Sequence, residues 1–76
     1  MANVPPLSDP RWTDFVTGRH DYQFSCLASR IMYGQVKILA RRDPAHAIRM
    51  AWDYFHRNEK LAAGDIQAVF GSEPHG

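Results

Sequence analysis

The sequence predicts an all-α fold, a small compact bundle of about four helices. One reason is an Asp-Pro pair that occurs at residues 9–10 and again at 43–44. Asp caps a helix and Pro suits its first position, so each pair predicts a helix start. Another reason is the spacing of Arg30, Lys37 and Arg41. At seven and four residues apart, these cations fall on one face of a helix.

The length and composition predict one small globular domain. The 76 residues allow a single domain with a small core, which we assign to residues 1–76. Apolar residues make up 45% of the chain, more than is usual in disordered segments. Two prolines predict an extended N-terminal arm over residues 1–7, and the polar end predicts a frayed tail over residues 71–76.

The first helix is predicted within residues 9–18, "DPRWTDFVTG". Asp9 is placed to cap it, and Gly18 suits the position just past its end. Trp12, Phe15 and Val16 follow the spacing i, i+3 and i+4 and therefore share an apolar face.

The stretch from residue 22 to residue 41 decides the fold class and allows two interpretations. In the favoured one, a long helix runs into Arg41 and breaks at residues 43–44. Turning each residue by about 100° places the polar positions within about 60° of arc and leaves the rest mostly apolar. This predicts a mostly buried helix. Gly34 would cost it about 1 kcal/mol relative to alanine, which a close helix crossing could offset.

The alternative for the same stretch is a β-hairpin followed by helices, an α+β fold. Tyr22, Phe24 and Cys26 alternate with polar residues, as in a strand, and residues 36–40 alternate less regularly. In a simple hairpin, however, Arg30 would face the opposite side from Lys37. The helical interpretation keeps the cations together, and we therefore favour it.

The third helix is predicted from the second Asp-Pro pair to about residue 60. Trp52 and Phe55 are predicted core residues on its apolar face. Arg49, Asp53 and Arg57 lie four residues apart on the opposite face and predict a ladder of ion pairs. A last short helix is predicted over residues 61–71, with its apolar face at Ile66, Val69 and Phe70 and its end at Gly71.

The sequence shows no pattern typical of catalysis or metal binding. The four histidines include no i, i+4 pair, and Cys26 has no second cysteine with which to form a disulfide or a zinc site. We expect Cys26 to be a small buried apolar residue. Several acids are placed to cap helices, and no carboxylate pair, serine nucleophile or glycine-rich phosphate loop stands out. We expect a non-enzymatic protein without a catalytic residue, cofactor or metal.

The clustered cations are the feature that indicates a partner. Residues 22–42 contain no acid but four cations, Arg30, Lys37, Arg41 and Arg42, which we call the basic stripe. We predict that the basic stripe binds a protein with an acidic surface. The protein would then be an adaptor, regulator or inhibitor of a larger complex. The alternative is a small nucleic-acid-binding regulator that uses the same stripe on phosphates.

Two further expectations concern location and assembly. The sequence has no uncharged run near the roughly 18 residues that a membrane span needs, and its first residues lack a signal-peptide pattern. We therefore expect a cytoplasmic protein that does not bind a membrane. The apolar circumference of the central helix needs more cover than three shorter helices provide, so we also predict a homodimer through this helix.

Overall fold

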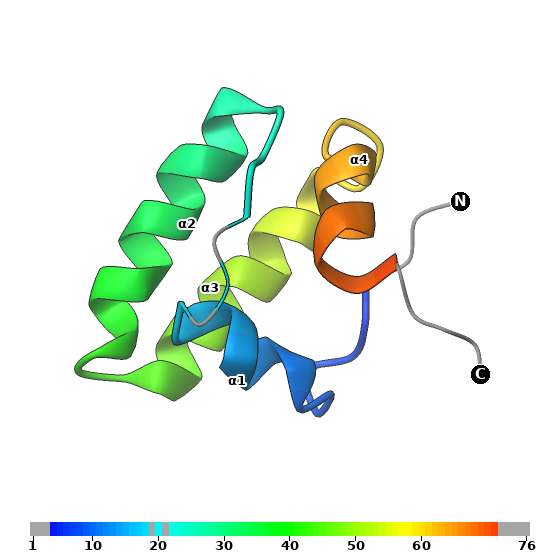
Figure 1. Cartoon of the computed structure of the whole chain (residues 1–76). Coiled ribbons are helices and arrows are strands. Elements are labelled where there is room, and N and C mark those ends of the chain that lie inside the picture. The colour runs from blue at the N-terminus through cyan, green and yellow to red at the C-terminus, as the bar shows by residue number, and fades with distance from the viewer. Residues whose placement is uncertain (1–3, 19, 21, 72–76) are drawn as a thin grey trace.

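The computed structural model describes residues 4–18, 20 and 22–71. Within them the protein is all-helical, with no strand (Figure 1). The all-α prediction is confirmed, and the β-hairpin alternative is excluded. The elements in chain order are α1 (Arg11–Val16), α2 (Leu27–Ala40), α3 (Pro44–Arg57), α4 (Ala63–Ile66) and the π-helical turn η1 (Gln67–Gly71).

Helix α1 ends where the sequence predicts, but it begins one residue later, at Arg11, with Pro10 at the N-cap position. The Asp9 carboxylate accepts a hydrogen bond from the Arg11 backbone N–H at 2.9 Å and pairs with the Arg11 guanidinium at 2.8 Å. Gly18 has a φ of +73°, a left-handed conformation that favours glycine just past a helix end. Of the predicted arm, residues 4–7 form no helix, and residues 1–3 lie outside the described residues. The Trp12 indole N–H donates to the Pro6 carbonyl at 3.0 Å, which ties the arm to α1.

The predicted long helix is wrong at its beginning, because α2 starts at Leu27. Residues 22–24 have no regular secondary structure, and they carry Tyr22 and Phe24 toward the core, where their rings stack at 5.7 Å. Alternation in this segment thus reflects extended backbone without a strand partner. The Asp65 carboxylate accepts hydrogen bonds from the N–H groups of Ser25 and Cys26 at 2.9 and 3.3 Å. These bonds give acceptors to the two backbone N–H groups that immediately precede α2.

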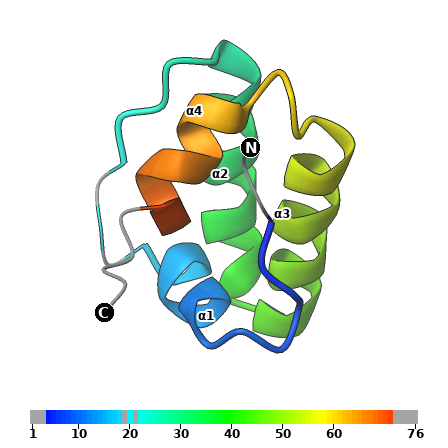
Figure 2. The ribbon, with the colours of Figure 1, turned by 90° about the vertical axis from the view of Figure 1, so that its right-hand side faces the viewer.

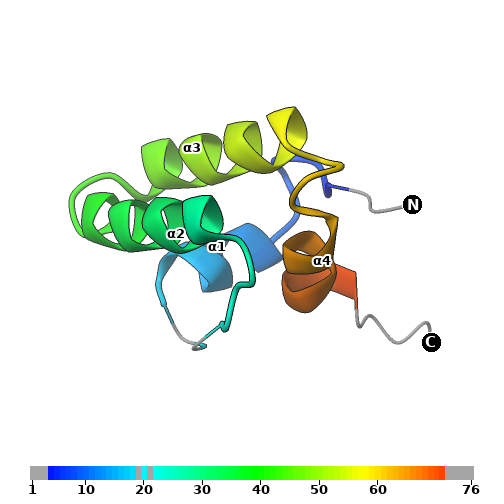
Figure 3. The same cartoon turned by 90° about the horizontal axis from the view of Figure 1, so that it is seen from above.

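Helices α2 and α3 are joined by a short turn, and they run side by side (Figure 3). Asp43 caps α3 as predicted, because its carboxylate accepts the His46 N–H at 3.1 Å and Pro44 occupies the first position. Among the described residues the expected ladder is half made, with Arg57 and Asp53 paired at 3.1 Å. Figure 2 shows α1 and α4 together on one side of α3, with α2 behind them.

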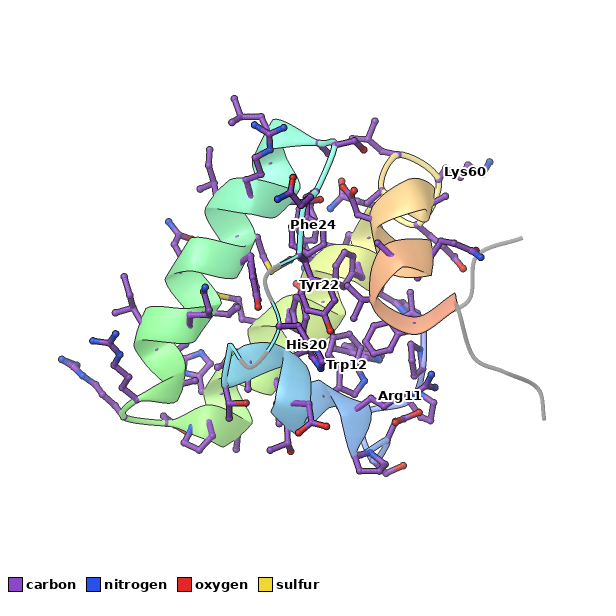
Figure 4. The ribbon with its side chains drawn as sticks, in the orientation of Figure 1. Arg11, Trp12, His20, Tyr22, Phe24 and Lys60 are labelled. Carbon is purple, nitrogen blue, oxygen red and sulfur yellow. The ribbon has the colours of Figure 1, made fainter. Side chains whose placement is uncertain are left out.

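The core is a cluster of aromatic rings contributed by α1, α2, α3, η1 and the segment before α2. Figure 4 shows Trp12, Tyr22 and Phe24 gathered at the centre of the molecule. The centres of the Trp12 and Phe70 rings lie 4.8 Å apart, so η1, which carries Phe70, packs against the cluster. The other fully or nearly fully buried apolar residues are Phe15, Val16, Met32, Tyr33, Val36, Ala47, Ala51, Phe55, Ala62 and Ile66.

The core predictions for α3 are confirmed at one residue and wrong at another. Phe55 is fully buried. Trp52 is only partly buried, and its ring stacks on the His56 ring at 4.6 Å. Trp52 lies about 60° around the helix from Phe55, at the edge of the face that α1 covers. The last predicted helix is present as α4 and η1, while residues 72–76 of the predicted tail lie outside the described residues.

Candidate functional site

The structure gives Arg30 and Lys37 of the basic stripe intramolecular contacts. The Arg30 Nε–H donates to the Phe24 carbonyl at 2.8 Å and so holds the segment that precedes α2. The Lys37 ammonium lies 4.5 Å from the centre of the Tyr33 ring, a cation–π contact. The Lys37 stem passes so close to Gly18 that an added Cβ there would lie 2.7 Å from its Cδ. Both cations therefore help to hold the fold together.

Arg41 and Arg42 are exposed at the end of α2. The last carbonyls of a helix carry partial negative charge, so cations are favoured at this position. Lys37 and Arg41 line one hollow together with Thr17 and Gly18, whereas Arg30 lines a different one with Tyr22. The structure thus brings Lys37 and Arg41 together and places Arg30 apart from them. The binding role predicted for the four cations stays a prediction.

An exposed face of α2 is apolar, contrary to the expectation of a mostly buried helix. Leu27, Ile31 and Ile38 are exposed by 65%, 54% and 66%. At 100° per residue these side chains fall within about 40° of arc, opposite the buried Val36. We call these three residues the apolar face. The spacing i, i+4 and i+11 is visible in the sequence, but nothing local tells whether another element covers it.

The basic stripe and a groove border the apolar face on opposite sides. Arg30, Lys37 and Arg41 lie about 40–80° around the helix from Leu27. On the other side, a groove of about 430 Å³ runs between α2 and α3. Ile31 and Met32 line it from α2, and Met50 and Tyr54 line it from α3. Met50 is 36% exposed, so apolar surface extends from the apolar face onto α3.

Asp65 lies in a buried polar network at the N-terminal end of α2. Asp65 is 3% exposed, and its carboxylate accepts hydrogen bonds from the Ser25 N–H, the Ser25 hydroxyl and the Cys26 N–H. Burial raises the pKa of Asp65, but the hydrogen bonds from Ser25 and Cys26 outweigh it and leave the pKa below its ordinary value. The carboxylate therefore stabilises the fold in its ionised form.

Cys26 is half-buried at the start of α2, which corrects the expectation of a buried residue. The backbone N–H groups of Ser29 and Ala28 lower the pKa of the Cys26 thiol, because they stabilise the thiolate. The hydroxyls of Ser29 and Tyr54 are hydrogen-bonded at 2.8 Å, and burial raises the pKa of Tyr54. This cluster joins α2 to α3.

The other titratable groups are dispersed. His46 and His56 are exposed on α3, the His20 carbonyl accepts the Tyr33 hydroxyl at 2.8 Å, and His75 lies outside the described residues. Within the described ranges, no group of three or more His, Cys, Asp or Glu side chains could hold a metal ion. The apolar face beside the basic stripe is therefore the candidate site.

In the part that the structure describes, no helix combines the length and apolar character needed to cross a membrane. Comparisons of the sequence with protein-family models and with curated proteins, and of the structure with solved structures, found no match.

Proposed function

We propose that this protein is a small, non-enzymatic protein-binding module that acts as an adaptor, regulator or inhibitor of a larger complex. The observation that supports this is the apolar face, three branched side chains that are exposed along the outer side of α2. Single exposed apolar residues are ordinary on protein surfaces, whereas a contiguous patch rimmed by polar residues is typical of an interaction site.

Covering the apolar face would release appreciable free energy. Full burial of a Leu or Ile side chain contributes about 1.5–3 kcal/mol. Met50 and the groove beside Ile31 extend the same surface onto α3. A partner that covers all of it gains enough to offset part of the cost of association, which is several kcal/mol. The apolar face would thus supply affinity.

The basic stripe would supply selectivity for a partner with an acidic surface. Arg41 and Arg42 are exposed at the end of α2, and Arg30 is exposed near its beginning. Complementary charges at the rim of an interface mainly raise the association rate and disfavour partners of like charge. The proposed partner is therefore a protein that presents apolar side chains bordered by Asp or Glu.

Affinity capture with matched variants tests this function. The bait would be the wild-type chain, a Leu27→Ser, Ile31→Ser, Ile38→Ser variant, and a Leu61→Ser control. Leu61 is 72% exposed outside α2, so the control removes an equally exposed apolar group elsewhere. A captured protein, once purified, should bind the wild type and the control but not the triple variant. Equal binding by all three folded baits would overturn the proposal.

The alternative, nucleic-acid binding through the basic stripe, makes a different prediction in the same variants. Binding to phosphates falls steeply as salt rises, and it needs no apolar side chain. Binding of a DNA or RNA oligonucleotide that survives the triple serine variant and disappears in an Arg41→Glu, Arg42→Glu variant would favour this alternative over a protein partner.

A further inference from the structure

We propose that the partner element is an acidic amphipathic helix that crosses α2 at Gly34. The proposal rests on the proposed function, since it names what the apolar face of α2 binds. Figure 1 shows α2 at the left edge of the molecule, where its outer side faces away from α1, α3 and α4. Gly34 lies on this outer side, between Ile31 and Ile38 along the chain.

Gly34 has no packing partner inside the described part of the chain. An added Cβ at Gly34 would meet no atom within 4 Å, so the helix crossing expected from the sequence does not occur within this fold. A glycine in the middle of an exposed helix nevertheless lowers its stability relative to alanine. Glycine also lets another backbone approach closely, because it has no side chain. A helix from outside the chain that crosses here would use that space.

The shape of the surface fits a helix. The apolar face runs along nearly the whole of α2, and the groove toward α3 lies beside it. Side chains of a helix at i, i+4 and i+7 would lie over Ile31, Ile38 and the groove, the usual anchors of a helix bound in a groove. Met50 lines the groove, and its flexible thioether adapts to the shape of an inserted side chain.

The charges of α2 favour an acidic helix over a second copy of the chain. In an antiparallel pair of α2 helices, a two-fold axis across the pair would bring both basic stripes to the same side of the interface. The stripes would repel each other, since residues 22–42 contain no acid. In a parallel pair, each stripe would face the partner's α3 side, where Asp53 already pairs with Arg57 at 3.1 Å. An acidic helix instead pairs directly with Arg30, Arg41 and Arg42.

A designed peptide of defined chemistry tests the proposal directly. It would have about 20 residues, long enough to form a helix, with Leu along one face and Glu along one edge. One control peptide carries Lys in place of Glu, and another carries a central Pro that breaks the helix. The readouts are the dissociation constant and the backbone amide shifts of the labelled protein. The Glu peptide should shift amides of α2 and of the groove side of α3, and both controls should bind at least tenfold more weakly.

Substitution of two glycines locates the crossing. Gly34→Ala should raise the melting temperature by about 4–8 °C and weaken binding of the Glu peptide at least fivefold. Gly64→Ala is the matched control, because Gly64 is also helical, exposed and without an atom within 4 Å of an added Cβ. Binding by this control should equal that of the wild type. If Gly34→Ala binds the peptide as tightly as Gly64→Ala, no helix crosses at Gly34.

The remaining outcomes separate this inference from the proposed function. If the Glu peptide fails to bind, or the Lys peptide binds equally well, the acidic helix is wrong. The capture experiment then decides the proposed function independently.

Sedimentation equilibrium at tens of micromolar tests the predicted homodimer. A dimer mass for the wild type that is lost on Ile31→Glu and Ile38→Glu would place a second copy on the apolar face and overturn the acidic helix.

Discussion

At the scale of single residues, the contacts that hold this fold join positions far apart in the chain. Asp65 lies 40 residues after Ser25 in the sequence, yet its carboxylate accepts the Ser25 N–H at 2.9 Å. Trp12 packs on Phe70, which lies near the other end of the described residues, and it also donates its indole N–H to the nearby Pro6 carbonyl. Residues of this kind combine burial with a polar contact, so their replacement removes both packing and a hydrogen bond.

Replacement of Asp65 by asparagine should destabilise the protein in a pH-dependent way. Loss of hydrogen bonds to a charged acceptor costs about 1.5–3 kcal/mol at neutral pH. The folded state lowers the pKa of Asp65. Its contribution is therefore present above the ordinary aspartate pKa of about 3.9 and is lost as pH falls through the lower folded value. Urea unfolding of wild type and Asp65→Asn across pH 2–7 measures the difference between their free energies of unfolding. This difference should become smaller below about pH 4.

The control for this measurement is Asp53→Asn. Asp53 pairs with Arg57 at the surface of α3, and exposed ion pairs contribute about 0–1 kcal/mol. A free energy of unfolding that falls equally in both variants would contradict the special role of Asp65 at the start of α2.

The two tryptophans should differ strongly in their effect on stability. Trp12 is fully buried, so Trp12→Ala should cost about 3–5 kcal/mol, as should Phe55→Ala. Such a loss unfolds most domains of this size. Trp52 lies at the edge of the core on His56, and Trp52→Ala should cost about 1 kcal/mol. Thermal unfolding of the three variants tests this, and equal losses for Trp12→Ala and Trp52→Ala would place Trp52 in the core.

At the scale of elements, α2 has three functionally different sides. The side of Val36 packs on the core, the side of the basic stripe holds the preceding segment and α1, and the apolar face is exposed. The same cations therefore serve the fold and border the candidate site. A substitution in the basic stripe must be chosen so that a loss of binding is distinguishable from a loss of stability.

Charge reversal at the end of α2 should slow binding and leave the fold intact. Arg41→Glu with Arg42→Glu loses favourable charge at the helix C-terminus, which costs about 0.3–1 kcal/mol each. Association with the acidic amphipathic peptide should become slower at low salt, with little change at high salt. Stopped-flow kinetics across a salt series measure this. Arg30→Met serves as a comparison, because it also removes a cation of the basic stripe. This variant loses the bond to the Phe24 carbonyl, so its free energy of unfolding should fall by about 1 kcal/mol.

The contrary outcome for the end of α2 is equally clear. If the folded Arg41→Glu, Arg42→Glu variant associates as fast as the wild type at low salt, these cations only offset the partial charge of the helix end. Binding would then depend on the apolar face alone.

At the scale of the whole molecule, the helices surround one aromatic cluster. Rings from α1, α2, α3, η1 and the segment before α2 all meet in it, with Phe15 and Tyr33 stacked at 4.8 Å. A core shared by all the elements predicts that they unfold together, as small single domains usually do.

Circular dichroism should show about half of the chain in helical conformation, in accordance with α1 to α4. Thermal unfolding followed by the helical signal and by tryptophan fluorescence should give one coincident transition, because Trp12 lies in the shared core. A helical content below about a third, the ordinary share of globular proteins, or two separate transitions would contradict this description.

The candidate site was predictable from the sequence only in part. The acid-free segment identified the residues of the basic stripe, because charges and spacing are visible in the chain. Tyr33 and Lys37 lie four residues apart within α2, so their contact was within reach of the helical spacing. The contact of Lys37 with Gly18 could not be recognised, because it depends on how α1 packs against α2. The spacing of Leu27, Ile31 and Ile38 was equally visible, but their exposure depends on which side of α2 the other helices cover.

The sequence by itself determined the all-α class, the start of α3, the end of α1 and, to within one residue, the start of α1, because caps, prolines and a left-handed glycine act within a few residues. Only the tertiary structure decided that α2 begins at Leu27, that Trp12 rather than Trp52 fills the core, and that the apolar face is exposed. Each of these depends on contacts between distant segments, such as the bond from Ser25 to Asp65. Periodicity shows which residues share a face, and packing decides which face is buried.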